Sequence, residues 1–241
     1  MVTCYKNIRA NILSELKGLI KYLNEFENKK KEGAQFYRIF QSSNFSILQL
    51  ITKMKILVLD NYDSFTYNLV YIVRQLGYGG QLEVFRNDKI SLEDVAQYDK
   101  IILSPGPGVP EDAGIMPELL TKYAATKSIL GVCLGHQAIG EAFGGELINL
   151  SEVLHGVAST VKVEDDLLFK DVPDTFSIGR YHSWVVDENT LSPDLEVIAR
   201  TPDNQIMAVR HKKFDVRGLQ FHPESILTEN GVQIIKNWME N

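Results

Sequence analysis

One short stretch, Gly131-Val132-Cys133-Leu134-Gly135, constrains the fold of this chain more than any other. The apolar residues 128–130 precede it, and residues 136–142 follow it with the pattern of a helix. The predicted order is therefore strand, sharp turn and helix, with Cys133 at the turn. Such a turn brings two chain segments close together, and the glycines on either side of Cys133 leave room for them.

Cys133 is a candidate nucleophile. The same geometry underlies the G-x-S-x-G nucleophile elbow of hydrolases. The N-terminus of the following helix directs backbone N–H groups and a positive dipole end at the sulfur, which favours the thiolate. A buried cysteine that only packs between a strand and a helix is the commoner case in proteins. The flanking glycines favour a nucleophile, but the turn alone leaves both interpretations open.

Composition excludes several classes of protein. The chain of 241 residues is long enough for one large domain or two small ones, and its net charge of −6 argues against general nucleic-acid binding. No apolar run is long enough to span a membrane. Cys4 and Cys133 are the only cysteines, which argues against a disulfide framework and indicates a reducing cytoplasm. The spacing of the histidines does not predict a zinc site.

The chain divides at Met54. Residues 1–53 hold nine Lys or Arg against four Asp or Glu and no proline, whereas the remainder is acidic and holds all eight prolines. Apolar residues at helical spacing between Ile12 and Phe26 predict an amphipathic helix, followed by a solvated break. We expect residues 1–53 to form a partly helical, dispensable extension, with Met54 as a candidate translation start, and residues 54–241 to form the functional domain. An interaction helix is the alternative.

From Met54 onward, strand and helix patterns alternate. Strands are expected at 55–59, 81–86, 100–103 and 129–132, and a helix capped by Asp63 or Ser64 is expected to run to Leu76, where Gly77 stops it. Such alternation predicts an α/β fold with an open, mostly parallel twisted sheet and helices on both faces. Active sites in these sheets lie at the carboxyl ends of the strands, and Cys133 follows one such end.

A rigid loop, Ser104-Pro105-Gly106-Pro107-Gly108, follows another of the predicted strands. Its prolines restrict the backbone, and its glycines allow another group to approach bare N–H groups. These are the requirements of an oxyanion hole. A stiff surface turn is the simpler interpretation of any isolated Pro-Gly cluster.

A third feature, His222-Pro223-Glu224, lies near the C-terminus. Pro223 favours an extended backbone at His222, and residues two apart in an extended chain point the same way. Glu224 could therefore orient the imidazole and stabilise its charged form, which would provide a base for a cysteine brought near by folding.

Together these stretches resemble the class I (triad-type) glutamine amidotransferases. The likeness is closest to the glutaminase small subunit, or component II, of anthranilate synthase and of aminodeoxychorismate synthase, and it spans Met54 to Asn241. The motifs that carry it are Leu59–Leu69, Ser104–Gly108, Gly131–Gln137, Arg180–Ser183 and Gln220–Thr228.

The resemblance implies a nucleophile, Cys133, with His222 and Glu224 as its partners. It also implies an oxyanion hole and glutamine-binding residues at Gly106, Pro107, Gly108, Leu134, Gln137, Ser183 and Trp184. It implies no metal site or cofactor in this chain. Its implied partners are L-glutamine as substrate and a chorismate-using synthase large subunit, which would hold the magnesium; nucleic acid and membranes are not expected partners.

Four functions remain open. The first is a glutaminase that supplies ammonia for anthranilate and hence tryptophan synthesis, and the second is the same role in aminodeoxychorismate and folate synthesis, or in both pathways. The others are a cysteine peptidase or γ-glutamyl hydrolase, and a catalytically silent binding subunit. The complete set of Cys133, His222 and Glu224 favours a glutaminase, and the overall likeness favours anthranilate synthesis.

Overall fold

The structure is a computed structural model that describes residues 54–151 and 153–241. The helix and the break predicted within residues 1–53 lie outside the described residues. The strands are β1 (Ile56–Asp60), β2 (Leu82–Arg86), β3 (Lys100–Leu103), β4 (Ser128–Val132), β5 (Leu147–Asn149), β6 (Val157–Val163), β7 (Thr175–Arg180), β8 (Trp184–Val186), β9 (Leu195–Arg200), β10 (Ile206–His211) and β11 (Val216–Leu219). The α-helices of this part are α3 (Thr66–Val73), α4 (Met116–Tyr123), α5 (Leu134–Ala142) and α6 (Gly231–Glu240).

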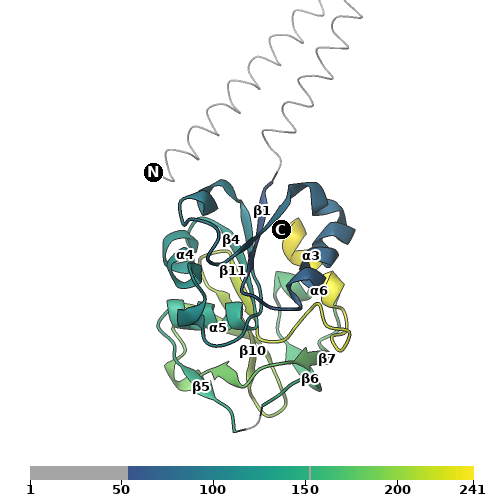
Figure 1. The fold of residues 1–241 in the computed structure, drawn as a ribbon. Coiled ribbons are helices and arrows are strands. Elements are labelled where there is room, and N and C mark those ends of the chain that lie inside the picture. The colour runs from purple at the N-terminus through teal and green to yellow at the C-terminus, as the bar shows by residue number, and fades with distance from the viewer. Residues whose placement is uncertain (1–53, 152) are drawn as a thin grey trace, which may run out of the picture. The chain divides into compact units, whose positions relative to one another are not determined.

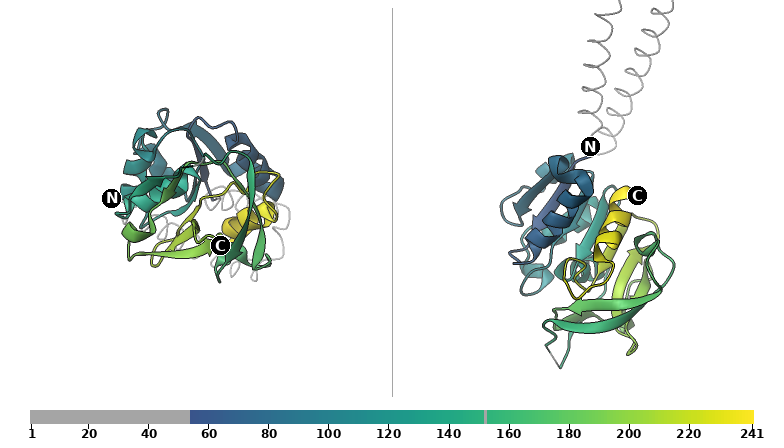
Figure 2. Two further views of the ribbon diagram at one scale, coloured as in Figure 1. Left: turned by 90° about the horizontal axis from the view of Figure 1, so that it is seen from below. Right: turned by 90° about the vertical axis from the view of Figure 1, so that its right-hand side faces the viewer.

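A nine-stranded sheet in the order β2-β1-β3-β4-β11-β10-β9-β6-β7 runs through the described part of the chain. The pairs from β2 to β11 are parallel, which confirms the predicted α/β sheet. The pairs from β11 to β7 are antiparallel, an extension that the sequence analysis did not predict. The green strands of this extension lie at the lower end of the right-hand view in Figure 2, away from blue α3.

Helices cover both faces of the parallel strands, as predicted. Alternate residues of β1 point to opposite faces: Ile56 and Val58 join a buried cluster with α3 and α6, whereas Leu57 and Leu59 join one with α4 and α5. Figure 1 shows α4 and α5 on one side of the central strands, and α3 and α6 on the other. Strands buried on both faces need continuous apolar runs, and the predicted strand at 55–59 has one.

The helix predicted after Asp63 begins later than expected. Its N-cap is Phe65, and the carboxylate of Asp63 accepts the Phe65 N–H at 2.7 Å. Asp63 therefore closes a turn just before α3 rather than capping the helix itself. The predicted stop at Gly77 is confirmed: α3 continues into a wider helical turn in which Gly77 takes a φ of 92°.

The far end of α6 is fixed at the amino edge of the sheet by a buried lysine. Lys100 Nζ donates a hydrogen bond to the carbonyl of Trp238 at 2.8 Å and lies 4.6 Å from the centre of its ring. A cation is favourable there because the C-terminal end of a helix carries the negative end of its dipole. Since α6 is held at this end, its beginning and the loop before it are placed at the carboxyl edge of the strands. Among the described residues, no helix is both long and apolar enough to cross a lipid bilayer.

Candidate active site

Cys133 occupies the strained turn that the sequence predicted. It lies between β4 and α5 with a φ of 51°, a region of backbone conformation that residues other than glycine rarely adopt. A Cβ atom on Gly131 would lie 2.4 Å from the backbone of Gly135, and one on Gly135 would lie 2.6 Å from the carbonyl oxygen of Leu103. Only glycine fits at both positions, because the start of α5 packs directly on the strands.

The proline–glycine loop lies beside this turn. A Cβ atom on Gly106 would come within 2.8 Å of the Leu134 side chain and 2.6 Å of Asn61 Cβ. The side chain of Asn61 donates a hydrogen bond to the Ser104 carbonyl at 2.8 Å, and the Asn61 N–H donates to Ser104 Oγ at 2.9 Å. The loop is therefore fixed from the end of β1 and is held against the helix that follows the cysteine.

His222 and Glu224 meet in a tight turn. Their side chains are buried, and Nδ1 of His222 lies 2.7 Å from Oε1 of Glu224. Contrary to the prediction, the chain does not continue extended through Glu224: the Ser225 N–H donates to the His222 carbonyl at 3.2 Å, so residues 222–225 form a turn with Pro223 at its second position. Proline is favoured at the second position of a β-turn. The predicted pairing of His222 with Glu224 is therefore present, but a turn produces it rather than an extended chain.

The sheet brings His222 to Cys133. Strand β11 pairs in parallel with β4, with Leu219 opposite Val132, so both chains leave the sheet side by side. The N–H of Cys133 donates to the Leu219 carbonyl at 2.7 Å. Nδ1 of His222 is occupied by Glu224, and its buried Nε2 has no partner by hydrogen-bond geometry among the described residues. Cys133 is nevertheless close enough to His222 to favour its protonated form.

The histidines near the site differ in charge. Burial lowers the pKa of His222, but Cys133 and Glu224 favour its protonated form and raise this pKa to about 10. Burial lowers the pKa of His136 to about 4. Burial and the neighbouring charge of Arg180 lower the pKa of His182 to about 3. At neutral pH, His222 is therefore the charged imidazole beside the cysteine, and His136 and His182 are neutral.

A polar network joins α5 to the strand β8. The Gln137 side chain donates to the Trp184 carbonyl at 2.8 Å, and Nδ1 of His182 lies 3.1 Å from the same oxygen. The carbonyl of Ser183 accepts a hydrogen bond from Leu150 N–H at 2.6 Å. The structure thus brings Gln137 and Trp184 together.

Two further predicted site residues, Pro107 and Gly108, lie in the Ser104–Gly108 loop, where both are exposed to solvent.

Gln220 is a site residue to which the sequence analysis gave no role. Its amide nitrogen lies 3.8 Å from Cys133 Sγ, and its amide oxygen lies 3.4 Å from the Gln137 side-chain nitrogen. Tyr181 was also missed, although its ring packs 4.9 Å from the His222 ring. Both residues belong to motifs that the sequence analysis had singled out, but only folding shows which members of a motif reach the cysteine.

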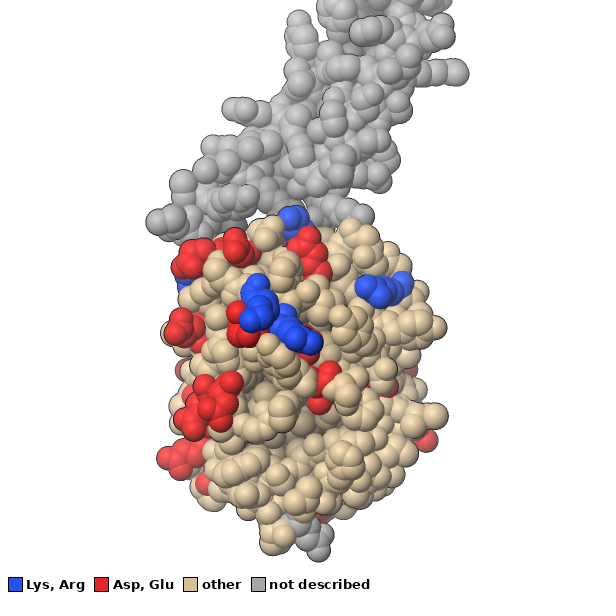
Figure 3. All heavy atoms as spheres, viewed as in Figure 1, with Lys and Arg blue, Asp and Glu red and all other residues tan. Residues whose placement is uncertain are grey.

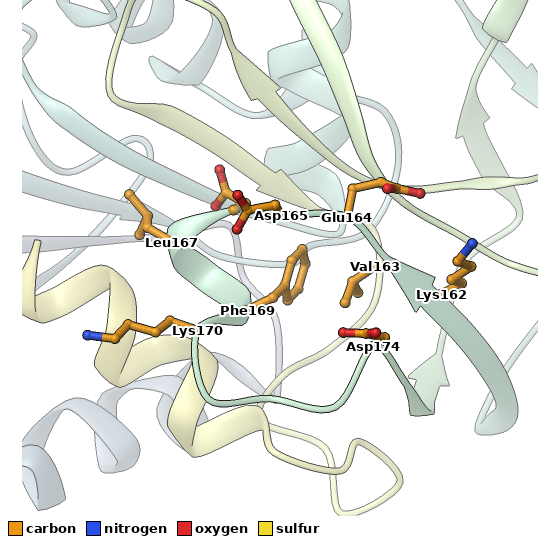
Figure 4. A pocket seen from close by; sticks show the side chains of 9 residues that line it. Lys162, Val163, Glu164, Asp165, Leu167, Phe169, Lys170 and Asp174 are labelled. Atoms are coloured by element: carbon orange, nitrogen blue, oxygen red, sulfur yellow. The ribbon is translucent and has the colours of Figure 1, made fainter.

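Two hollows lie elsewhere on the antiparallel part of the molecule. One, of about 490 Å³, is bordered by acidic and basic side chains of the segment from Lys162 to Asp174 (Figure 4). The other, of about 510 Å³, is bordered by Arg210, Lys212 and their neighbours. Neither of these two hollows contains any of the predicted site residues.

The chain also matches known proteins in sequence. The sequence profile of the family "Glutamine amidotransferase class-I" matches residues 57–241. The chain is 46% identical over 188 residues to anthranilate synthase component 2 of Pyropia yezoensis, a match that covers 77% of this chain and 98% of that protein. It is 43% identical over 191 residues to the bifunctional protein TrpGD of Thermotoga maritima, covering 78% of this chain and only 32% of that protein.

The fold also matches a solved structure. A glutamine amidotransferase from Thermotoga maritima superposes with a TM-score of 0.58 at 17% sequence identity. The match covers 78% of this chain and 81% of that protein. At this identity the likeness concerns the fold alone.

Proposed function

Because the chain belongs to the class-I glutamine amidotransferase family, we propose that it is the glutaminase subunit of anthranilate synthase. In this role it hydrolyses glutamine and passes ammonia to a chorismate-using synthase subunit. The observation that carries the proposal is the strained Cys133 beside the buried pair of His222 and Glu224. The component 2 relative, which this chain covers almost from end to end, favours the anthranilate pathway.

The reaction begins with the sulfur of Cys133. Its thiolate attacks the side-chain amide carbon of glutamine, and the carbonyl oxygen becomes an oxyanion. Backbone N–H groups of Gly106 and Leu134 are the proposed donors to that oxyanion, since the loop and the start of α5 meet there. Losing one such donor typically slows a reaction about 100- to 1,000-fold.

His222 then acts as the general acid. Nε2 of its imidazolium donates a proton to the leaving nitrogen, the carbon–nitrogen bond breaks, and ammonia departs. A γ-glutamyl thioester remains on Cys133. Neutral His222 accepts a proton from water as the water attacks the thioester, which releases glutamate and restores the thiolate. Glu224 keeps the imidazole oriented and favours its charged form.

The glutamine would be held beside Cys133 by the remaining family positions, Gly108, Gln137, Ser183 and Trp184. Gln137 supports the proposal because its side chain donates a hydrogen bond to the Trp184 carbonyl. This bond holds the backbone at Trp184 against α5. Pro107 keeps the neighbouring loop rigid.

The proposed partner is the synthase large subunit, component 1. Ammonia released into neutral water would be protonated and would no longer act as a nucleophile. The two subunits must therefore dock so that ammonia passes directly from one site to the other. Chorismate and magnesium belong to the partner in this proposal.

A replacement of the nucleophile tests the function. Mixed with component 1 from the same organism, the chain should support anthranilate synthesis from chorismate and either glutamine or ammonium. Cys133→Ala should lower the glutamine-dependent rate at least about 1,000-fold and leave the ammonium-dependent rate unchanged. Unchanged glutamine-dependent synthesis would instead show a silent binding subunit.

A growth test separates the two chorismate pathways. A strain with Cys133→Ala, grown in medium poor in ammonium, should be rescued by tryptophan alone. A requirement for p-aminobenzoate alone would assign the chain to aminodeoxychorismate synthesis, and a requirement for both would indicate a shared subunit.

A further inference from the structure

Arg180 is a buried cation to which the proposed mechanism gives no role. The lysine and arginine side chains visible on the face shown in Figure 3 lie at the surface. In the described part of the chain only Lys100 and Arg180 are buried lysine or arginine residues, and Lys100 holds the end of α6. Arg180 is the last residue of β7 and is 4% exposed. A buried arginine is usually paired with a carboxylate, because burial removes its hydration.

The side chain of Arg180 donates instead to two uncharged groups. Its Nε–H donates to Nε2 of His182 at 3.2 Å, and its Nη2 donates to the side-chain oxygen of Gln205. The amide nitrogen of Gln205 donates in turn to the carboxylate of Asp203 at 2.8 Å. The turn before β10 therefore fixes the guanidinium so that its Nε–H is directed at the imidazole.

Two hydrogen bonds determine the tautomer of His182. A guanidinium can only donate, so Nε2 of His182 must accept the bond from Arg180. Nδ1 lies 3.1 Å from the carbonyl oxygen of Trp184, which can only accept, so Nδ1 must carry a proton. Both bonds exist together only when the ring is neutral and its single proton is on Nδ1. A second proton would place a positive charge against Arg180 inside the fold.

The peptide of Trp184 is turned towards α5. Strand β8 pairs with β5, and the Leu150 N–H donates to the Ser183 carbonyl at 2.6 Å, so Ser183 faces β5. Successive residues of a strand alternate in direction, and the N–H and C=O of one residue point to the same side. Trp184 therefore faces away from β5, where its carbonyl accepts from Gln137 and His182. Its N–H points to this side too, towards the helix that begins next to the cysteine.

We propose that Arg180 and His182 are positioning residues for glutamine. Arg180 keeps His182 as a hydrogen-bond donor, and His182 and Gln137 together hold the Trp184 peptide with its N–H towards the substrate. This inference rests on the proposed function, and it adds two residues that belong to neither the catalytic nor the glutamine-binding set.

The chemistry of glutamine indicates which group the Trp184 N–H binds. A free glutamine offers two kinds of acceptor, the side-chain carbonyl and the α-carboxylate. The side-chain carbonyl is held at Cys133 during the reaction, so the α-carboxylate is the acceptor that remains. Because the α-carboxylate does not change during the reaction, loss of this contact weakens substrate binding and leaves the chemical step intact.

The test measures glutamate release by the full chain with component 1 and chorismate, over a range of glutamine concentrations. His182→Leu removes the donor to Trp184 and should raise KM for glutamine about 20-fold, with kcat within about twofold of the wild type. In His182→Asn the amide nitrogen can lie where Nδ1 lies, so KM should stay within about threefold of the wild type. Both replacements remove the ring acceptor at Nε2, so only the donor to Trp184 distinguishes them.

A second pair of variants examines Arg180. Arg180→Met keeps the length of the side chain but removes its donors, and it should raise KM about 10-fold at unchanged kcat. Lys162→Met is the matched control, because it removes an exposed cation from the neighbouring strand β6 and should leave KM unchanged.

Nitrogen-15 NMR of the histidine rings provides a readout that does not depend on activity. The signal of His182, identified by its absence from His182→Asn, should show a proton on Nδ1 and none on Nε2 at neutral pH. A proton on Nε2 would overturn the inference, because the bond from Arg180 could not then exist.

The kinetic outcomes separate this inference from the proposed function. If the wild type turns over glutamine but both His182 variants have the KM of the wild type, or both raise it equally, the donor at Nδ1 positions nothing and the proposed function stands. A fall in kcat at unchanged KM would likewise overturn the inference. If the wild type with component 1 releases no glutamate from glutamine, the proposed function fails and this inference fails with it.

Discussion

Nδ1 of His222 lies 2.7 Å from Oε1 of Glu224, and both side chains are removed from solvent. A buried carboxylate at this distance favours the charged imidazole, and it also restricts how the ring can turn. The pair follows β11, which lies next to β4, the strand that ends just before Cys133.

The first prediction concerns stability at alkaline pH. The pKa of His222 is raised from 6.5 to about 10, so the folded state holds this proton more tightly than the unfolded state does. The resulting stabilisation is fully present below pH 6.5 and is lost as the pH rises through about 10. The free energy of unfolding, measured by urea denaturation, should therefore fall across this range. The fall should be smaller in Glu224→Gln.

Glu224→Gln should also lower kcat for glutamine at least about 100-fold, since the imidazole loses its orienting carboxylate. Glu118→Gln, which removes a charge from the exposed side of α4, is the matched control for both measurements. An identical alkaline decline in Glu224→Gln and in the control would contradict the role given to this carboxylate.

The second prediction concerns stability in acid. Burial and the charge of Arg180 lower the pKa of His182 from 6.5 to about 3. The unfolded state therefore binds this proton more readily, and the stability present above pH 6.5 is lost as the pH falls towards 3. His182→Gln should show a shallower acid decline in unfolding free energy than the wild type. Cys133→Ala keeps His182 and should decline as steeply as the wild type; equal slopes in all three proteins would refute the assignment.

The third prediction concerns the turn at Cys133. Gly131→Ala forces a methyl group to within 2.4 Å of the Gly135 backbone and should destabilise the fold by about 3 kcal/mol. Gly79→Ala is the control because a Cβ atom there meets only the flexible Arg74 side chain, at 3.2 Å. It should stay within about 1 kcal/mol of the wild type. Urea denaturation measures both, and equal stability of the two variants would show that the turn tolerates a side chain.

The fourth prediction concerns the N-terminal extension. All proposed catalytic residues and the whole family match lie within residues 57–241. A protein consisting of residues 54–241 should therefore fold cooperatively and hydrolyse glutamine at a rate within about twofold of the full chain, since it keeps every group that the mechanism uses. Thermal unfolding and glutamate release measure the two properties. Loss of either one would show that residues 1–53 contribute to the functional unit.

Local sequence rules were sufficient for the parallel half of the molecule and for the turn that holds Cys133. Continuous apolar runs such as the one in β1 predict strands covered on both faces. Glycines around Cys133 predict a turn between strand and helix, because the steric limits of that turn involve only neighbouring residues. The pairing of His222 with Glu224 was predicted too, although for the wrong backbone geometry.

The antiparallel half was not predicted, because its strand pairs join segments that local patterns do not connect. Strand β6, for example, pairs with both β7 and β9. The positions of Gln220 beside Cys133 and of Tyr181 beside His222 were missed for the same reason, since each depends on contacts between residues far apart in the sequence.

The sequence by itself therefore determined two local features: a cysteine in a glycine-lined turn, and a histidine paired with a carboxylate two residues away. Only the tertiary structure decided that β11 lies beside β4, which places His222 next to Cys133 and buries His136 and His182 as neutral rings. The physical reason is that backbone preferences act over a few residues. Charge state and proximity depend instead on the complete packing of the folded chain.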